Sequence, residues 1–339
     1  MNRKLMLLGF QGTNCYLVHS PDSHPGADAQ CLCLIDTGSA WPTSSSFLPL
    51  LREGILALGE RAIKVVDGHD PLTSITDIVL THRHPDHVGG LKSILATFRA
   101  KNLPYPRVYK FPHPVETLAS GETVDWDQLL IDDAWPTSAH ATALTWLKDG
   151  QQIPLQQKST TSGPTCTLRV VHTPGHTEDS ISLVIAETGE LFTADTVLGQ
   201  GTSVFADLSA CKSFILVAVT YGWNSDFVDG ADMASLHKLL ELQPSTVYPG
   251  HGPHVEDQTS SIAKIEEYIN HRNERERQIM AVLQEKTTDQ SVRDIVEELY
   301  AGLGIGVYIA AEKPVIAHLK KLANDGKVMK SPDGKWRQL

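Results

Sequence analysis

The sequence lacks long apolar runs and any excess of basic charge. Its longest apolar stretch, 214–220, falls far short of the roughly 18 residues that a membrane-spanning helix needs, so we expect no membrane partner. The 29 Lys and Arg residues stand against 40 Asp and Glu residues, a formal net charge of −11. This balance disfavours a general binder of nucleic acid or anionic membranes, because Lys and Arg neutralise phosphate.

Cysteine is also scarce. The five residues are odd in number and scattered along 339 positions, which disfavours a disulfide framework. They are Cys15, Cys31, Cys33, Cys166 and Cys211. The first ten residues have neither the layout of a signal peptide nor the Arg and Ser content of a mitochondrial leader. We therefore expect a cytoplasmic protein with reduced thiols. Its 41% hydrophobic and 20% charged residues are typical of a globular chain with a substantial core.

Short apolar runs bounded by turn residues predict strands, and longer amphipathic stretches predict helices. Strands are expected at 14–19, 31–36, 75–81, 168–172, 180–185, 190–194 and 246–248. Helices are expected at 46–59, 91–99, 232–242, 258–286, 291–301 and 313–324. This order of elements indicates an α/β fold in which helices cover the outer faces of two sheets, a four-layer αββα sandwich.

The character of the chain changes near residue 257. We predict a first domain over 1–257, within which 210–232 is set apart below, and a C-terminal helical module over 258–339, ending in a basic hairpin. Residues 271–339 hold twelve Lys and Arg against ten Asp and Glu, whereas the preceding 270 residues hold 17 against 30. Five lysines of the module could line a phosphate path, but a solvated helix face is the interpretation we favour. They are Lys320, Lys321, Lys327, Lys330 and Lys335.

Four side chains that bind metals lie within six residues, directly after the predicted strand 75–81. They are His82, His84, Asp86 and His87. Imidazole and carboxylate together suit Zn2+, with Mn2+ or Fe2+ as alternatives. A structural zinc site would favour Cys, and no Cys belongs to this cluster.

Three further donors follow predicted strands downstream: His176, Asp195 and His251. Seven donors are too many for one tetrahedral ion, but they suit two. The prediction places His82, His84 and His176 on one ion, Asp86, His87 and His251 on the other, and Asp195 between them. Two such ions share a water, lower its pKa and stabilise the oxyanion formed by its attack. Asp86 is also a candidate catalytic residue, as the proton donor to the leaving group.

Three other polar residues near these motifs have more than one interpretation. Asp36 either supports the metal ligands by hydrogen bonding or simply forms a turn. His172 and His254 are expected to be structural rather than ligating.

The chain resembles the metallo-β-lactamase fold family, and within it the branch that holds β-lactamase-like mitochondrial endoribonucleases and fungal carrier-protein thioesterases of the atrochrysone carboxyl type. The motifs that carry the resemblance are Gly12-Thr-Asn14, Asp36-Thr-Gly38, Thr81-His-Arg-His-Pro-Asp-His87, His172-Thr-Pro-Gly-His176, Gly199-Gln-Gly-Thr-Ser-Val-Phe205, Tyr248-Pro-Gly-His-Gly-Pro253, His271-Arg-Asn273, His318-Leu-Lys-Lys-Leu322 and Gly326-Lys-Val328. It implies a metallo-β-lactamase sandwich followed by a winged-helix-like module.

Two departures from that family pattern stand out. Only eleven residues precede Gly12, so the family's first strand is expected to be short or missing. Residues 210–232 are predicted to be an insertion, to which we assign no function.

The resemblance implies a metal-dependent hydrolase of secondary metabolism. We favour a thioesterase that releases a polyketide from an acyl carrier protein, its expected partner. The alternative is an endoribonuclease of single-stranded RNA, which the acidic body disfavours because an RNA path should be basic. The acyl group, the physiological metal and the oligomeric state stay open.

Overall fold

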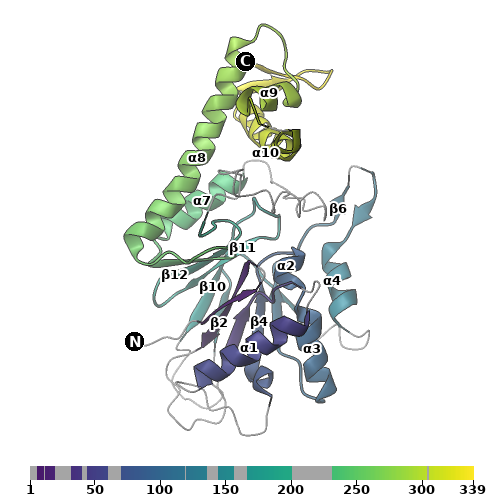
Figure 1. The fold of residues 1–339 in the computed structure, drawn as a ribbon, viewed down its shortest axis with the longest axis vertical. Helices are drawn as coiled ribbons and strands as arrows, with labels where there is room; N and C mark the ends of the chain where they lie inside the picture. The colour runs from purple at the N-terminus through teal and green to yellow at the C-terminus, as the bar shows by residue number, and fades with distance from the viewer. Residues whose placement is uncertain are drawn as a thin grey trace.

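The structure is a computed structural model that describes residues 6–10, 12–19, 32–39, 44–59, 70–118, 120–135, 144–155, 166–200, 231–303 and 305–339. Two sheets form its centre, with strand orders β1-β2-β3-β4-β5-β8 and β13-β12-β11-β10-β9. Figure 1 shows the two sheets in the lower part of the molecule and the C-terminal helices above them.

The first sheet is antiparallel over its first three strands and parallel from β3 onward. Its strands are β1 (Met6–Phe10), β2 (Thr13–His19), β3 (Leu32–Ile35), β4 (Ile75–Leu80), β5 (Arg107–Lys110) and β8 (Leu144–Trp146). The helical segments that follow or join them are α1 (Ser44–Gly59), η1 (Pro71–Ser74), α2 (Pro85–Val88), α3 (Leu91–Ala100) and α4 (Trp126–Ala134). A small hairpin, β6 (Glu116–Thr117) and β7 (Thr123–Val124), precedes α4.

The second sheet is antiparallel except where β12 meets β13. Its strands are β9 (Gln152–Pro154), β10 (Thr167–His172), β11 (Ile181–Ile185), β12 (Glu190–Ala194) and β13 (Thr246–Pro249). The helix α7 (Ala231–Glu241) and the start of α8 (Gln258–Glu285) pack on its outer face.

Alternating side chains create the layers. On β2, Cys15 and Leu17 join the core under α1 and α3, whereas Tyr16 and Val18 join the core between the two sheets. All seven residues of β2 are buried, because the strand is covered on both faces. On the other sheet, Val171 and Leu191 join a third core beneath α7 and α8. The αββα sandwich predicted from the sequence is thus confirmed.

The C-terminal module has its own core. It consists of the end of α8, α9 (Val292–Leu299), α10 (Ile305–Asn324) and the hairpin β14 (Val328–Lys330) and β15 (Trp336–Gln338). Two of the five lysines considered for a phosphate path bind carboxylates: Lys321 lies 3.0 Å from both Glu276 and Asp325, and Lys327 lies 3.5 Å from Asp325. These ion pairs favour a helix-surface role over a phosphate path.

Two helices differ from the expectation. α10 begins eight residues before the predicted start, because Gly306 and Pro314 inside it imitate a loop. α4 was not expected, although Asp125 caps it by accepting a hydrogen bond from Gln128 N at 2.9 Å, a recognisable start signal.

The remaining expectations have mixed outcomes. The first strand is present as β1, five residues long. Cys15 and Cys33 are buried free thiols and Cys166 is buried, whereas Cys31 and Cys211 lie outside the described residues. The predicted insertion 210–232 also lies outside them, apart from its last two residues, which begin α7. Within the described ranges, no helix is both long enough and apolar enough to cross a membrane.

Candidate metal centre

The seven predicted donors meet where strands of both sheets end. β4 leads directly through Thr81 to His82, and the short helix α2 then carries Asp86 and His87. Pro85 occupies its first turn, where the missing N–H costs nothing and the fixed φ favours the helix. From the second sheet, β12 ends at Ala194 and β13 at Pro249, which brings Asp195 and His251 to the same edge.

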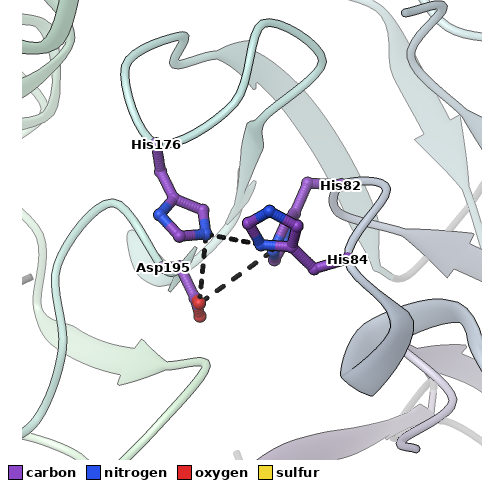
Figure 2. Close-up of side chains that lie close together, drawn as sticks. All are labelled: His82, His84, His176 and Asp195. Atoms are coloured by element: carbon purple, nitrogen blue, oxygen red, sulfur yellow. Dashed lines mark hydrogen bonds and ion pairs between the residues drawn. The ribbon is translucent and has the colours of Figure 1, made fainter. Parts of the chain in front are cut away.

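The first set of donors is His82, His84, His176 and Asp195. His84 Nδ1 lies 3.1 Å from His82 Nε2 and 2.9 Å from His176 Nε2. Figure 2 shows the three imidazoles and the carboxylate turned toward one another. Asp195 Oδ2 lies 3.4 Å from His176 Nε2 and 4.0 Å from His82 Nε2.

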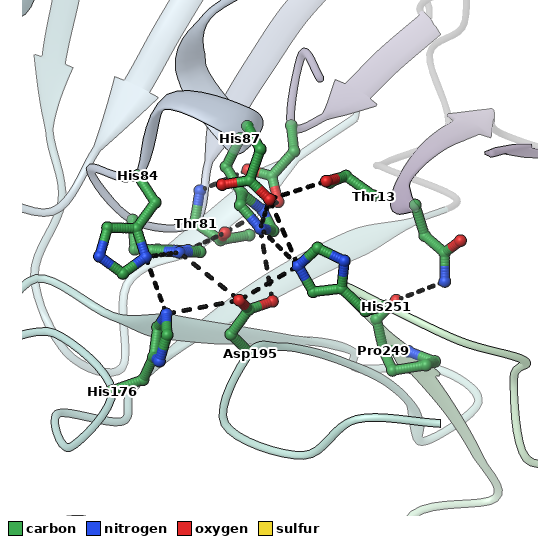
Figure 3. A network of polar contacts seen from close by, with 12 residues as sticks. Thr13, Thr81, His84, His87, His176, Asp195, Pro249 and His251 are labelled. Carbon is green, nitrogen blue, oxygen red and sulfur yellow. Dashed lines mark hydrogen bonds and ion pairs between the residues drawn. The ribbon is translucent and has the colours of Figure 1, made fainter. Parts of the chain in front are cut away.

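The second set is Asp86, His87 and His251. Asp86 Oδ2 lies 3.3 Å from Nε2 of both His87 and His251. These two ring nitrogens are 3.4 Å apart. Figure 3 shows His87 and His251 of this set within one network of polar contacts that also holds His84, His176 and Asp195 of the first.

Asp195 lies between the two sets. Its Oδ1 is 3.4 Å from His87 Nε2, and its Oδ2 is 3.3 Å from His251 Nε2. Gly250 makes this approach possible, because a Cβ at that position would lie 2.2 Å from Asp195 Oδ1. The carboxylate thus has the place expected of a bridging ligand.

The donor set suits metal ions. Nitrogens bound to one tetrahedral zinc lie about 3.3 Å apart, since each Zn–N bond is about 2.0–2.1 Å long. The separations of 3.1 and 2.9 Å in the first set and 3.4 Å in the second are close to this value. The burial of Asp195, at 8% exposure beside five imidazoles, also fits a cation in this place.

Burial and neighbouring charges separate the imidazoles into two electrostatic groups. Burial, together with the nearby His176, lowers the pKa of His84 to about 3, and burial and the other imidazoles hold the pKa of His82 well below its usual value. Burial also disfavours charge on His251, but Asp195 and Asp86 outweigh it and raise its pKa to about 10. The second set therefore attracts positive charge, whereas the first offers neutral nitrogen donors.

Hydrogen bonds from the far side turn two imidazoles inward. Asp36 Oδ2 lies 2.8 Å from His87 Nδ1 and accepts a hydrogen bond from Thr81 Oγ1 at 2.8 Å. Thr81 Oγ1 lies 3.0 Å from His82 Nδ1. These contacts leave Nε2 of His82 and His87 facing the centre, as partners of metal-binding histidines do. They favour the supporting role of Asp36 over a simple turn.

Residues near the amino terminus make two contacts with the donors that were not predicted from the sequence. Thr13 Oγ1 donates to Asp86 Oδ2 at 2.8 Å, and His251 Nδ1 donates to Gly12 O at 2.7 Å. The Gly12-Thr-Asn14 motif was the available signal, but it does not reveal a partner far along the chain. His172 and His254 lie outside both sets: His172 stacks on Phe111 with ring centroids 4.0 Å apart, and His254 lies 3.1 Å from Glu256.

Comparison with known proteins identifies the family. Residues 8–251 match the model of the metallo-beta-lactamase superfamily, about seven-tenths of the chain. The chain belongs to the metallo-beta-lactamase superfamily. In this superfamily member, residues 291–336 further match the beta-lactamase associated winged helix domain.

The superfamily member is similar to several known proteins. It is 36% identical to the beta-lactamase-like protein 2 homolog of Drosophila melanogaster over 77% of this chain and 73% of that one. It is 26% identical to the atrochrysone carboxyl ACP thioesterase of Passalora fulva over 96% of this chain and 76% of the relative. A solved metallo-beta-lactamase family protein from Thermus thermophilus shares the fold with a TM-score of 0.61, at 19% identity, over 99% and 98% of the two chains.

Proposed function

We propose that this protein is a hydrolase with two metal ions that cleaves the thioester between an acyl chain and an acyl carrier protein. One observation supports the hydrolase proposal above all: the two donor sets meet at Asp195. Its carboxylate lies 3.3–3.4 Å from imidazoles of both sets. A single-ion structural site would not need a second set of donors on the same carboxylate.

Each ligand has a defined part in this proposal. His82, His84 and His176 would hold one ion, and Asp86, His87 and His251 the other, with Asp195 between them. Two zinc ions would supply a water of lowered pKa and polarise the carbonyl under attack, and Mn2+ or Fe2+ are the alternatives. Asp36 and Thr81 would keep the imidazoles oriented, which a preorganised site requires.

Asp86 has a second part in the proposal. One of its oxygens accepts the Thr13 hydroxyl at 2.8 Å, so the orientation of the carboxyl group is fixed. It belongs to the second set and borders Thr13, close enough to the centre to take a proton from the attacking water and pass it to the thiolate as the C–S bond breaks. We assign it that step because the surrounding imidazoles have their nitrogens directed to the centre or to the supporting residues.

The thioester is supported by fungal relatives. The Passalora thioesterase is similar over nearly the whole chain, and a thioesterase from Emericella nidulans is 30% identical over 80% of this chain. The more similar Drosophila relative has a name that specifies no substrate. The acidic charge of residues 1–270 supports a thioester over RNA, because an RNA path would need basic side chains.

The two substrate classes can be separated directly. Protein purified without added metal is incubated with an acyl-carrier-protein thioester and with labelled single-stranded RNA, each with and without chelator. We expect thioester hydrolysis that the chelator abolishes and that added Zn2+ restores. RNA cleavage that the chelator abolishes, without thioester turnover, would overturn the proposed substrate but retain the metal centre. Turnover that resists complete removal of metal would contradict the proposed role of the two ions.

A further inference from the structure

A buried ammonium group lies at the end of β5. The side chain of Lys110 is 1% exposed, and its Nζ lies 2.6 Å from Asp127 Oδ1 and 2.7 Å from Asp179 Oδ2. Nζ also donates to Phe111 O at 3.0 Å. A lysine is retained in the interior only with such partners, because its charge loses the hydration that water provides. This cluster contains none of the seven predicted metal donors.

One of the two carboxylates belongs to the turn that carries His176. Asp179 follows His176 by three residues, and its side chain is completely buried. Burial raises the pKa of Asp179, but the charge and hydrogen bond of Lys110 outweigh it and hold the pKa below its usual value. The ionised pair therefore fixes this turn against β5.

Lys110 is also next to the loop that carries His82. In the parallel register of the first sheet, Lys110 pairs with Leu80, two residues before His82. The amide of Ile181, two residues after Asp179, donates a hydrogen bond to Thr81 O at 3.0 Å. This bond joins the backbones of the two segments that carry His176 and His82. The ammonium group thus contacts one ligand-bearing segment, and the backbone of Lys110 pairs with the strand that leads to the other.

The second carboxylate leads back to the His82–His84 loop. Asp127 Oδ2 accepts a hydrogen bond from the amide of His113 at 2.7 Å. His113 Nε2 in turn accepts one from Arg83 Nε at 3.1 Å, and Arg83 separates the two ligands. Polar contacts therefore run from Lys110 to both sides of the first donor set.

We propose that Lys110 is a positioning residue for the first ion: with Asp179 and Asp127 it holds the His176 turn at the correct distance from the His82–His84 loop. The inference rests on the metal centre of the proposed function. It assigns no contact between Lys110 and substrate, and it predicts a defect in one ion site rather than in both.

The test compares Lys110→Met with Arg107→Met. Arg107 is the control, since it lies on the same strand and its Nη2 is 2.8 Å from the completely buried Asp77, although its own side chain is 56% exposed. Both changes remove a cation from buried carboxylates, two for Lys110 and one for Arg107, but only Lys110 contacts the turn that carries His176. Thermal unfolding of each variant measures the shared loss of stability.

The deciding readout is metal binding. Each apoprotein is titrated with Zn2+ against a chromophoric chelator, and with Co2+ for the visible absorption of the bound ion. We expect two ions in the wild type and in Arg107→Met. In Lys110→Met, we expect one tight ion and at least a ~10-fold weaker second, since loss of a supporting partner typically costs about 10–100-fold in affinity. The Co2+ spectrum of the weakened site should also change.

Several results would overturn the inference. Two ions at wild-type affinity in Lys110→Met would do so, as would equal losses of metal in both variants at equal losses of thermal stability. If Lys110→Met fails to fold, Asp179→Asn decides, because it removes the charge and keeps the volume: unchanged binding of both ions rejects the inference. A wild type that binds no metal would instead contradict the proposed function.

Discussion

At the scale of single residues, most of the centre's chemistry lies in side chains that meet only through the fold. His84 contacts His82 from the same loop, but its closest approach is to His176, 92 residues away along the chain. Removing one imidazole takes a nitrogen donor from the first set and leaves the second set complete. Loss of a single ligand therefore tests whether the two sets act as separate sites.

We expect His84→Ala to lose at least one ion per chain and nearly all turnover, about 10²-fold or more. Metal analysis of protein purified without added ions, together with the thioester assay, measures both effects. His254→Ala is the matched control, because that histidine is exposed and paired with Glu256 outside both sets. A His84→Ala protein with full metal content and full rate would show that the ligand assignment is wrong.

At the scale of elements, α8 connects two cores. Its Ile265 and Tyr268 pack against α7 and the second sheet, whereas Ile279 and Leu283 pack within the C-terminal module. Tyr268 OH also accepts a hydrogen bond from Leu198 N at 2.9 Å, just beyond Asp195. Between these two groups lies Glu276, which is buried beside α10.

Glu276 should stabilise the junction of α8 and α10 in a pH-dependent way. Burial raises its pKa, but His318 and Lys321, with atoms 3.6 and 3.0 Å away, outweigh it and lower the pKa below 4.5. A lowered folded pKa means that the stabilisation is present above the unfolded value and is lost as the pH falls through the folded value. The stabilisation by Glu276 is therefore fully present at neutral pH.

We expect Glu276→Gln to reduce the free energy of unfolding at pH 7 by about 1–2 kcal/mol, the size of a lost charged hydrogen bond. The difference from the wild type should narrow as the pH falls below about 4.5. Urea unfolding at several pH values measures it. Glu274→Gln, on the exposed face of the same helix, is the control and should change stability little. An equal loss at pH 7 and at pH 3 would contradict the prediction.

At the scale of the whole molecule, the predicted domain boundary at 257/258 coincides with the start of α8. The hydrophobic clusters, however, divide within that helix, between Ile269 and Ile279. A chain that ends at residue 257 would lose Ile265, Tyr268 and Ile269 from the core beneath α7. Loss of each large buried side chain lowers the free energy of unfolding by about 2–5 kcal/mol. Together the three losses approach the roughly 5–15 kcal/mol that is the typical free energy of unfolding of a whole domain.

We therefore expect residues 1–257 alone to aggregate or to unfold without cooperativity. Residues 1–273, which retain those three side chains, should fold and bind metal. Circular dichroism during heating, size-exclusion chromatography and metal analysis compare the two. A soluble, cooperatively folded 1–257 protein with two ions would show that the start of α8 is dispensable to the catalytic core.

The sequence by itself determined the layers and predicted the candidate donors. Strands of largely apolar character, such as 75–80, predicted buried sheets, because a strand covered on both faces needs few polar side chains. Clustered His and Asp at the ends of such strands predicted the candidate ligands, since the donor chemistry is a property of the residue type. Local signals were weaker where Gly306 and Pro314 lie inside α10, because they also mark loops.

Only the tertiary structure decided which residues support those donors. Thr13 meets Asp86, Asp36 meets His87, and Lys110 meets Asp179, each across 50 or more residues of chain. A hydroxyl, a carboxylate or an ammonium group carries no mark of its partner in the sequence. The register of the sheets and the packing of the loops select that partner, because a buried polar group is stable only where a complementary group already lies within hydrogen-bonding distance.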